Sequence, residues 1–170
     1  MTDYRRYYIT GGCFFFTVVL AERHTALLTR RITTLRDAFK EVMQAHPFTI
    51  DAIVVLPDHL HCIWQLPEGD SDYSSRWREI KKYVSRRIVA NQANAIKEVW
   101  QPRFWEHRLR DEKDFNLHVD YIHYNPVKHG MVTRPVDWQH SSIHRYIRHK
   151  IIHSDWGSGS LILSDCIGHE

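Results

Sequence analysis

Residues 48–66, FTIDAIVVLPDHLHCIWQL, contain two apolar segments separated by one short turn. The segments run from Phe48 to Leu56 and from His59 to Leu66, and both are rich in β-branched and aromatic residues, which favour strands. Pro57-Asp58 between them is a turn signal. So short a connection allows only an antiparallel neighbour, and the sequence therefore predicts a β-hairpin.

Two further elements precede the hairpin. Gly11-Gly12 opens a strand that runs through Leu20 and is apolar on both faces, which is typical of a central strand. Apolar residues at helical spacing then predict a long helix over 28–45. His46-Pro47 should end this helix, because the residue before a proline is disfavoured in the α conformation.

Periodic segments also follow the hairpin. Helical spacing predicts a second helix over 73–92, and Phe104 to Leu109 reads as a fourth strand. Asp111 can cap a third helix, whose end is expected near Asn125-Pro126. A short helical piece over 142–148 is expected after it.

This order of elements predicts an α+β protein with a ferredoxin-like split βαβ sandwich. Its four-stranded antiparallel sheet should carry the two crossover helices on one face and the third helix on the other. One domain is expected over residues 1–154. Residues 155–170 lack Lys and Arg, include Gly157-Ser158-Gly159-Ser160, and should form a loosely packed C-terminal tail.

Composition is that of a globular protein, with 43% hydrophobic and 25% charged residues. The 23 Lys and Arg against 20 Asp and Glu give a net charge of only +3, whereas 13 histidines are an unusually large number. Three widely spaced cysteines favour a reducing, cytoplasmic location over a disulfide framework. The longest apolar run, Cys13 to Ala21, is too short to cross a membrane.

The predicted third strand carries a histidine pair. Alternate side chains of a strand share a face, so Leu60, Cys62 and Trp64 should enter the helix-covered core while His59 and His61 point to the other side. Two imidazoles so placed suit a bidentate metal site. Histidines that merely meet solvent or hydrogen-bond would show the same pattern.

The predicted third helix carries the second candidate segment. Tyr121 and Asn125 are four residues apart and therefore stack on one face. This face borders the apolar stripe of the helix, so the Tyr121 hydroxyl could reach the sheet face with His59 and His61. A boundary tyrosine bonded to the backbone is the alternative.

Together the two segments favour phosphodiester chemistry. A divalent cation held by two imidazoles and an amide oxygen can polarise a phosphate, and a tyrosine one helical turn away is a nucleophile. Attack on phosphorus would give a phosphotyrosine and a free 3′-hydroxyl. Tyr124 is the competing nucleophile, but it points elsewhere around the helix.

Several segments resemble one known family. Pro57-Asp58-His59-Leu60-His61 is similar to the HUH motif, and residues 121–130, YIHYNPVKHG, closely resemble the signature of the REP-associated tyrosine transposases. These are relatives of the single-tyrosine insertion-sequence transposases. The opening residues 4–12, the strand Phe14–Val19 and residues 138–142 also resemble this family, so the resemblance covers residues 4 to about 148.

The resemblance implies an HUH endonuclease fold that cleaves and rejoins single-stranded DNA at repetitive extragenic palindromes. It implies Tyr121 as the nucleophile and His59, His61 and Asn125 as ligands of Mg²⁺ or Mn²⁺. Asn125 stands where the insertion-sequence relatives usually carry glutamine, and the change keeps an amide oxygen. A monomer is expected rather than the dimer of those relatives.

Binding of DNA requires positive charge near the phosphates. The predicted second helix has six basic residues in twelve positions, a pattern that a solvated helix face also produces. Lys128 and His129 follow the predicted catalytic helix, and Arg5 and Arg6 stand beside tyrosines that could stack on bases. The candidate DNA contacts are Arg5, Arg6, Arg76, Arg78, Lys81, Lys82, Arg86, Arg87, Lys128 and His129.

The sequence thus predicts a metal-dependent single-stranded DNA endonuclease and strand transferase that acts on hairpin DNA through a 5′-phosphotyrosyl intermediate. A protein that binds DNA hairpins and regulates without cutting is the first alternative. A small metal hydrolase is the second, but it leaves the Tyr121–Asn125 face and the basic helix unexplained.

Overall fold

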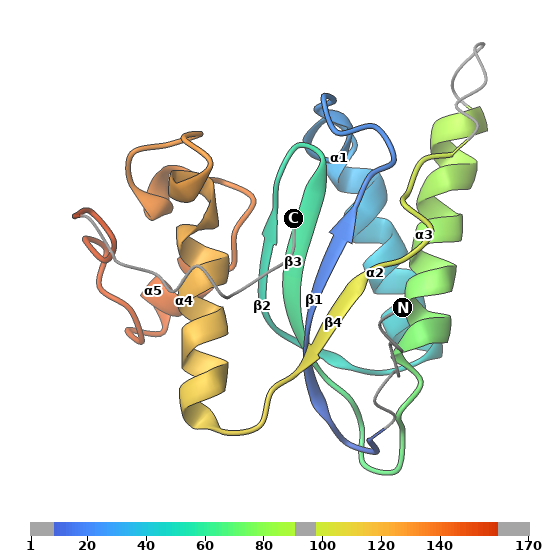
Figure 1. Ribbon diagram of the computed structural model, residues 1–170, viewed down its shortest axis with the longest axis horizontal. Coiled ribbons are helices and arrows are strands. Elements are labelled where there is room, and N and C mark those ends of the chain that lie inside the picture. Colours follow the sequence, from blue (N-terminus) through green and yellow to red (C-terminus); the bar gives the residue numbers. More distant parts are fainter. Residues whose placement is uncertain (1–8, 91–97, 160–170) are drawn as a thin grey trace, which may run out of the picture.

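A computed structural model describes residues 9–90 and 98–159 of the chain. The strands of its four-stranded antiparallel sheet lie in the order β2-β3-β1-β4 (Figure 1). They are β1 (Cys13–Val19), β2 (Thr49–Val55), β3 (His59–Gln65) and β4 (Trp105–Arg108). The β2–β3 hairpin and the ferredoxin-like arrangement are confirmed.

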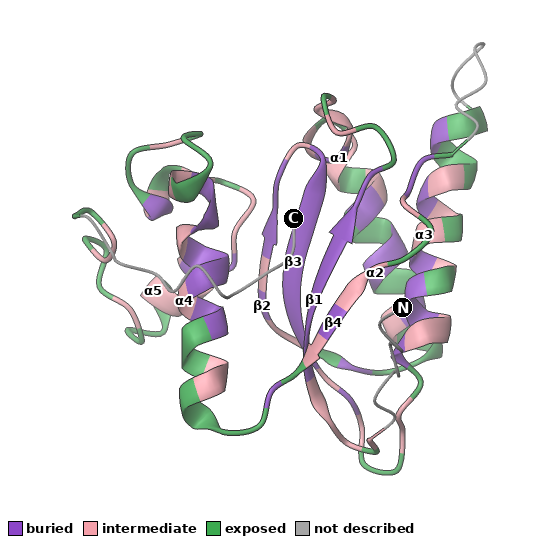
Figure 2. Cartoon of the chain, viewed as in Figure 1, coloured by how far each residue is buried: buried purple, intermediate pink, exposed green. Residues whose placement is uncertain are grey.

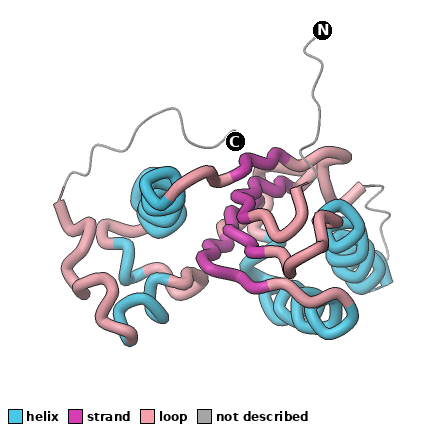
Figure 3. Tube along the Cα trace, turned by 90° about the horizontal axis from the view of Figure 1, so that it is seen from below, coloured by secondary structure: helices cyan, strands magenta, loops and turns pink. Residues whose placement is uncertain are grey.

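The helices form a layer on each side of the sheet (Figure 3). On one side, α2 (Ile32–Ala45) and α3 (Tyr73–Ala90) enclose a core that includes Phe14, Phe16 and Trp64. On the other side, α4 (Glu112–Lys128) packs on Phe15 and Ile63. Because both faces are covered, β1 and β3 are buried along almost their whole length (Figure 2).

The expected helix over 28–45 is wrong in one respect, because the chain forms α1 (Leu27–Arg30) and then α2. Arg31, between them, has φ −109° and ψ 27°, outside helical geometry. The Leu28 N–H donates to the Pro57 carbonyl over 3.0 Å, and the Leu28 side chain is buried in the core. These two contacts anchor α1 to the β2–β3 turn and to the core. Of the expected helix over 73–92, residues 91 and 92 lie outside the described part.

The third expected helix also departs from its predicted end. α4 does not stop at Asn125-Pro126 but continues through Pro126 to Lys128. A proline removes one main-chain donor, yet Asn125 and Pro126 are both buried against the rest of the protein, and this packing holds the helix together. The Asp111 cap is confirmed, since its side chain accepts from the Asp114 N–H over 2.8 Å.

The C-terminal part covers the edge of the sheet at β2. Val54 and Ser141 form a bridge, and the Ser142 hydroxyl accepts from the Ile53 N–H over 2.9 Å. The short 3-10 helix η1 (Pro135–Asp137) precedes this contact, and α5 (Ile143–Arg148) follows it. α5 agrees with the short helical piece expected over 142–148. Among the described residues, no helix has the length and apolarity needed to cross a membrane.

Candidate active site

The histidine pair lies on β3, on the face covered by α4, as the strand alternation predicts. His59 and His61 are 1% and 0% exposed, and their ring centroids are 5.1 Å apart. Leu60, Cys62 and Trp64 point to the opposite core, again as predicted. The two imidazoles are therefore interior groups rather than solvent-facing ones.

Each ring is oriented through its Nδ1 atom. His59 Nδ1 lies 2.6 Å from Asp58 Oδ1, and His61 Nδ1 lies 2.9 Å from the Thr17 hydroxyl. A histidine whose Nδ1–H donates to such a partner presents the lone pair of Nε2 for ligation. The Asp58 carboxylate can only accept, so it presents Nε2 of His59 for ligation, and the Thr17 hydroxyl does the same for His61 when it accepts from Nδ1.

Asp58 is itself held in its charged form. Burial alone would raise the pKa of Asp58, but hydrogen bonds from His59 and Arg23 outweigh burial and lower that pKa. The Arg23 guanidinium lies 2.7 Å from the carboxylate. His59 is therefore oriented by a full negative charge, whereas His61 is oriented by a neutral hydroxyl.

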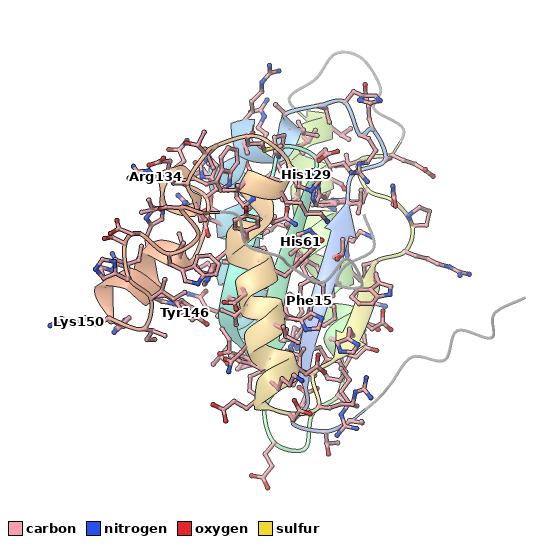
Figure 4. The ribbon with its side chains drawn as sticks, turned by 60° about the vertical axis from the view of Figure 1, so that its left-hand side comes forward. Phe15, His61, His129, Arg134, Tyr146 and Lys150 are labelled. Atoms are coloured by element: carbon pink, nitrogen blue, oxygen red, sulfur yellow. The ribbon has the colours of Figure 1, made fainter. Side chains whose placement is uncertain are left out.

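α4 presents three successive turns of one face to the histidine pair. The Tyr121 ring centroid is 5.2 Å from that of His61, and the His129 centroid is 5.1 Å from that of His59. Asn125 lies one helical turn from Tyr121 and from His129, on the same face of α4, and is completely buried. Figure 4 shows His61 and His129 along the side of α4 that meets the sheet, with Phe15 further along.

The tyrosine prediction can be compared with its competitor. Tyr121 is 1% exposed and also packs edge-on against Phe15, with centroids 6.0 Å apart. Tyr124 instead has the Trp156 ring as a neighbour, 6.5 Å away. The two tyrosines therefore lie on different sides of α4, and only Tyr121 is in ring contact with the pair.

The donor set fits a divalent cation. His59 Nε2, His61 Nε2 and Asn125 Oδ1 are all buried, and imidazole nitrogens with an amide oxygen suit several first-row ions. The orienting Nδ1 contacts are those that metal-bound histidines usually have. His59, His61 and Asn125 are thus the residues that could hold such an ion beside Tyr121.

A second group of possible metal ligands lies nearer the start of α4. Donor atoms of His107, Asp114 and His118 all lie within 4.8 Å of one another, close enough to hold a metal ion. Burial would raise the pKa of Asp114, but hydrogen bonds from His107 and from the Arg110 N–H lower it, and burial lowers the pKa of His118. The rings of His107 and His118 are stacked, with centroids 4.8 Å apart and 15° between their planes.

The basic residues of the expected DNA surface fall into separate places. Lys128 contacts Tyr121, and the His129 ring contacts that of His59. The basic residues of α3 lie on the other side of the sheet, because α3 covers the opposite face. Arg5 and Arg6 lie outside the described residues.

Within α3 the basic residues are not equivalent. Arg78, Lys82, Arg86 and Arg87 are exposed, although Arg78 and Lys82 both lie near Glu79. Lys81 is half-buried and donates to the Gln101 carbonyl over 2.7 Å. These four exposed side chains are the basic residues of α3 that a phosphate could reach from solvent.

Arg76 does not fit the expected surface. It is 3% exposed and is held by Asp70 at 2.6 Å and by the carbonyls of His46 and Pro47 at 3.1 and 2.9 Å. These bonds tie the start of α3 to the end of α2. The charge of Arg76 is neutralised within the protein, and we leave this residue out of the DNA surface.

Sequence reasoning gave no role to the residues that orient the pair. The position of Asp58 next to His59 in the sequence could have suggested its role. No sequence pattern indicates Thr17, because its position opposite His61 depends on the pairing of β1 with β3. The contact between Lys128 and Tyr121 was also missed, because the helix was expected to end before Lys128.

Comparison with known proteins assigns the chain to a family. Residues 13–125 match the family described as "Transposase IS200 like". The chain belongs to the IS200-like transposase family. The histidine pair, Tyr121 and Asn125 all lie inside the matched range.

Relatives place this IS200-like transposase among the REP-associated tyrosine transposases. It is 53% identical to the REP-associated tyrosine transposase of Escherichia coli K12 over 92% of this chain and 91% of that protein. Identity to a putative REP-associated tyrosine transposase of Haemophilus influenzae is 43%, over 92% and 94% of the two chains. The predicted enzyme class is therefore confirmed at the level of the family.

A solved structure agrees in fold. It is described as a REP-associated tyrosine transposase bound to a REP hairpin, and it is 48% identical to this chain. The TM-score is 0.86 over 99% of this chain and 100% of the other. The IS200-like transposase described here thus has the fold of that relative.

Proposed function

We propose that this transposase cleaves and rejoins single-stranded DNA next to a hairpin, with Tyr121 as the nucleophile. The observation that carries the proposal is the position of Tyr121, whose ring lies against His61 while Asn125 follows one helical turn later. The REP hairpin bound by the 48% identical relative supports hairpin DNA as the substrate class.

Each residue has a defined task in this proposal. His59 and His61, oriented by Asp58 and Thr17, and Asn125 would hold Mg²⁺ or Mn²⁺. When bound there, the ion would polarise the scissile phosphate. Tyr121 would attack phosphorus, giving a 5′-phosphotyrosyl link and a free 3′-hydroxyl, and the reverse reaction with another 3′-hydroxyl would rejoin DNA.

DNA contacts are proposed at two places. Lys128 and His129 would meet phosphates near the scissile bond, because they adjoin the histidine pair. Arg78, Lys82, Arg86 and Arg87 would contact a more distant part of the DNA from α3. Arg5 and Arg6 stay in the proposal on their sequence alone.

The test is a covalent adduct. End-labelled single-stranded DNA carrying a REP hairpin is incubated with Mn²⁺, and a shift on a denaturing gel is measured. The wild-type protein should form the adduct and Tyr121→Phe should not, although both bind the hairpin. Tyr124→Phe is the matched control and should form it.

Two results would contradict this mechanism. Adduct formation by Tyr121→Phe would remove Tyr121 as the nucleophile. Hairpin binding by the wild-type protein with no adduct in Mg²⁺ or Mn²⁺ would favour the non-cleaving regulatory protein instead.

A further inference from the structure

Lys128 lies directly against the proposed nucleophile. Its Nζ atom donates to the Tyr121 hydroxyl oxygen over 3.3 Å and lies 4.9 Å from the centre of the Tyr121 ring. The two residues are seven positions apart, about two helical turns, and therefore share one face of α4. They can do so only because α4 continues through Pro126.

We propose that Lys128 is a catalytic residue that acts on the Tyr121 oxygen, and not only a contact for a DNA phosphate. The inference rests on the proposed function, in which this oxygen attacks phosphorus. It adds to the phosphate contact of Lys128 a second task, which is to stabilise the attacking oxygen.

The charge balance of the step explains why a cation is needed there. The Tyr121 O–H bond breaks, a bond from this oxygen to phosphorus forms, and the bond from phosphorus to the 3′ oxygen breaks. The proton from Tyr121 ends on the released 3′ oxygen. Before its bond to phosphorus is complete, the tyrosine oxygen gains negative charge.

The surroundings strengthen the effect of the lysine. Tyr121 is 1% exposed, and a charge interaction in such a water-poor place is stronger than the same interaction in water. A donor that is already in position when charge develops needs no reorganisation during the reaction. The Lys128 ammonium therefore stabilises the developing charge and also fixes the direction of the phenol.

Exposure separates the two residues in a useful way. Lys128 is exposed whereas Tyr121 is buried. Replacing the lysine should therefore leave the core intact. A phosphate that reaches the tyrosine oxygen also comes close to the ammonium, so affinity and rate must be measured separately.

The experiment measures the rate of adduct formation at saturating hairpin DNA in Mn²⁺, together with the dissociation constant of the hairpin. Lys128→Met should lower the saturating rate at least about tenfold, as the loss of a donor to a developing oxyanion does. The dissociation constant should change by less than about threefold, since one phosphate contact is a small part of such an interface. Lys128→Arg keeps the charge and the donor and should recover part of the rate.

Lys113→Met is the matched control, because Lys113 is exposed at the opposite end of α4. It removes the same charge away from Tyr121 and should keep the wild-type saturating rate. Thermal unfolding of the variants checks that each one is folded.

The outcomes separate this inference from the proposed function. A wild-type adduct that needs Tyr121, together with an unchanged saturating rate in Lys128→Met, overturns the role of Lys128 alone. The same holds if Lys128→Met only weakens hairpin binding. If the wild-type protein forms no adduct that needs Tyr121, the proposed function fails and this inference fails with it.

Discussion

His59 and His61 face the same space but are oriented by chemically different partners. Asp58 holds His59 with a charge that Arg23 helps to maintain, while Thr17 holds His61 with a hydroxyl. A carboxylate makes a ligating imidazole more basic than a neutral partner does. At the scale of the residue, His59 should therefore be the stronger of the two ligands.

Replacement of Asp58 tests this difference. Asp58→Asn removes the charge behind His59 and should raise the Mn²⁺ concentration that gives half-maximal adduct about tenfold or more. The measurement is a Mn²⁺ titration of adduct formation. Thr17→Val removes the partner of His61 and serves as the comparison, with a smaller expected effect. An unchanged Mn²⁺ requirement in Asp58→Asn would show that His59 needs no orienting charge.

At the scale of the element, the end of α4 decides where Lys128 lies. The Met131 N–H donates to the Pro126 carbonyl over 2.9 Å. The Gly130 N–H donates to the Val127 carbonyl, also over 2.9 Å. This pair of bonds is the Schellman pattern, which requires a left-handed residue at Gly130, where φ is 65°. The last turn of α4 is therefore closed by the glycine of the sequence motif.

Substitution of this glycine should cost stability for a conformational reason alone. No heavy atom lies within 4 Å of a Cβ added at Gly130, so Gly130→Ala meets no steric obstacle. The left-handed conformation nevertheless costs a non-glycine residue about 1 kcal/mol. Urea unfolding should show a loss of about this size. Gly159→Ala is the control, also with open space around its Cβ but without a positive φ, and equal unfolding free energies of the two variants would refute the argument.

At the scale of the whole molecule, the sheet separates two groups of positive charge. Lys128 and His129 lie with α4 on one side, and the exposed basic residues of α3 lie on the other. Binding of DNA at α3 can therefore contribute affinity without touching the reacting atoms. DNA that meets both groups must pass around an edge of the sheet.

This separation predicts how α3 variants behave. Replacing Arg78, Lys82 and Arg86 by Gln should weaken hairpin binding and reduce the slope of log affinity against log salt by about 0.7 to 0.9 for each phosphate that the protein no longer neutralises. The adduct rate at saturating DNA should stay at the wild-type level. The measurement is hairpin affinity over a range of salt concentrations. An unchanged affinity and slope would identify these residues as an ordinary solvated helix face.

Much of this architecture could be predicted because it follows from short-range geometry. The alternation along residues 59–66 assigns the histidines and the apolar residues to opposite faces of a strand, and that assignment is confirmed. Helical spacing likewise places Tyr121 and Asn125 on one side of α4, where the described structure has them. The expected tail over 155–170 and the monomeric state stay predictions.

The order of the strands and main helices, the face on which each histidine lies and the shared face of Tyr121 and Asn125 can all be deduced from the chain, because two-residue and 3.6-residue periods are properties of neighbouring residues. Folding in three dimensions is needed to place Thr17 opposite His61, to bury Arg76 and to bring Lys128 to Tyr121. The position of Thr17 depends on strand register, and the burial of Arg76 depends on packing between helices. The contact of Lys128 with Tyr121 depends on the continuation of α4 through the buried Pro126. Such contacts join residues far apart in the chain and leave no periodic pattern in it.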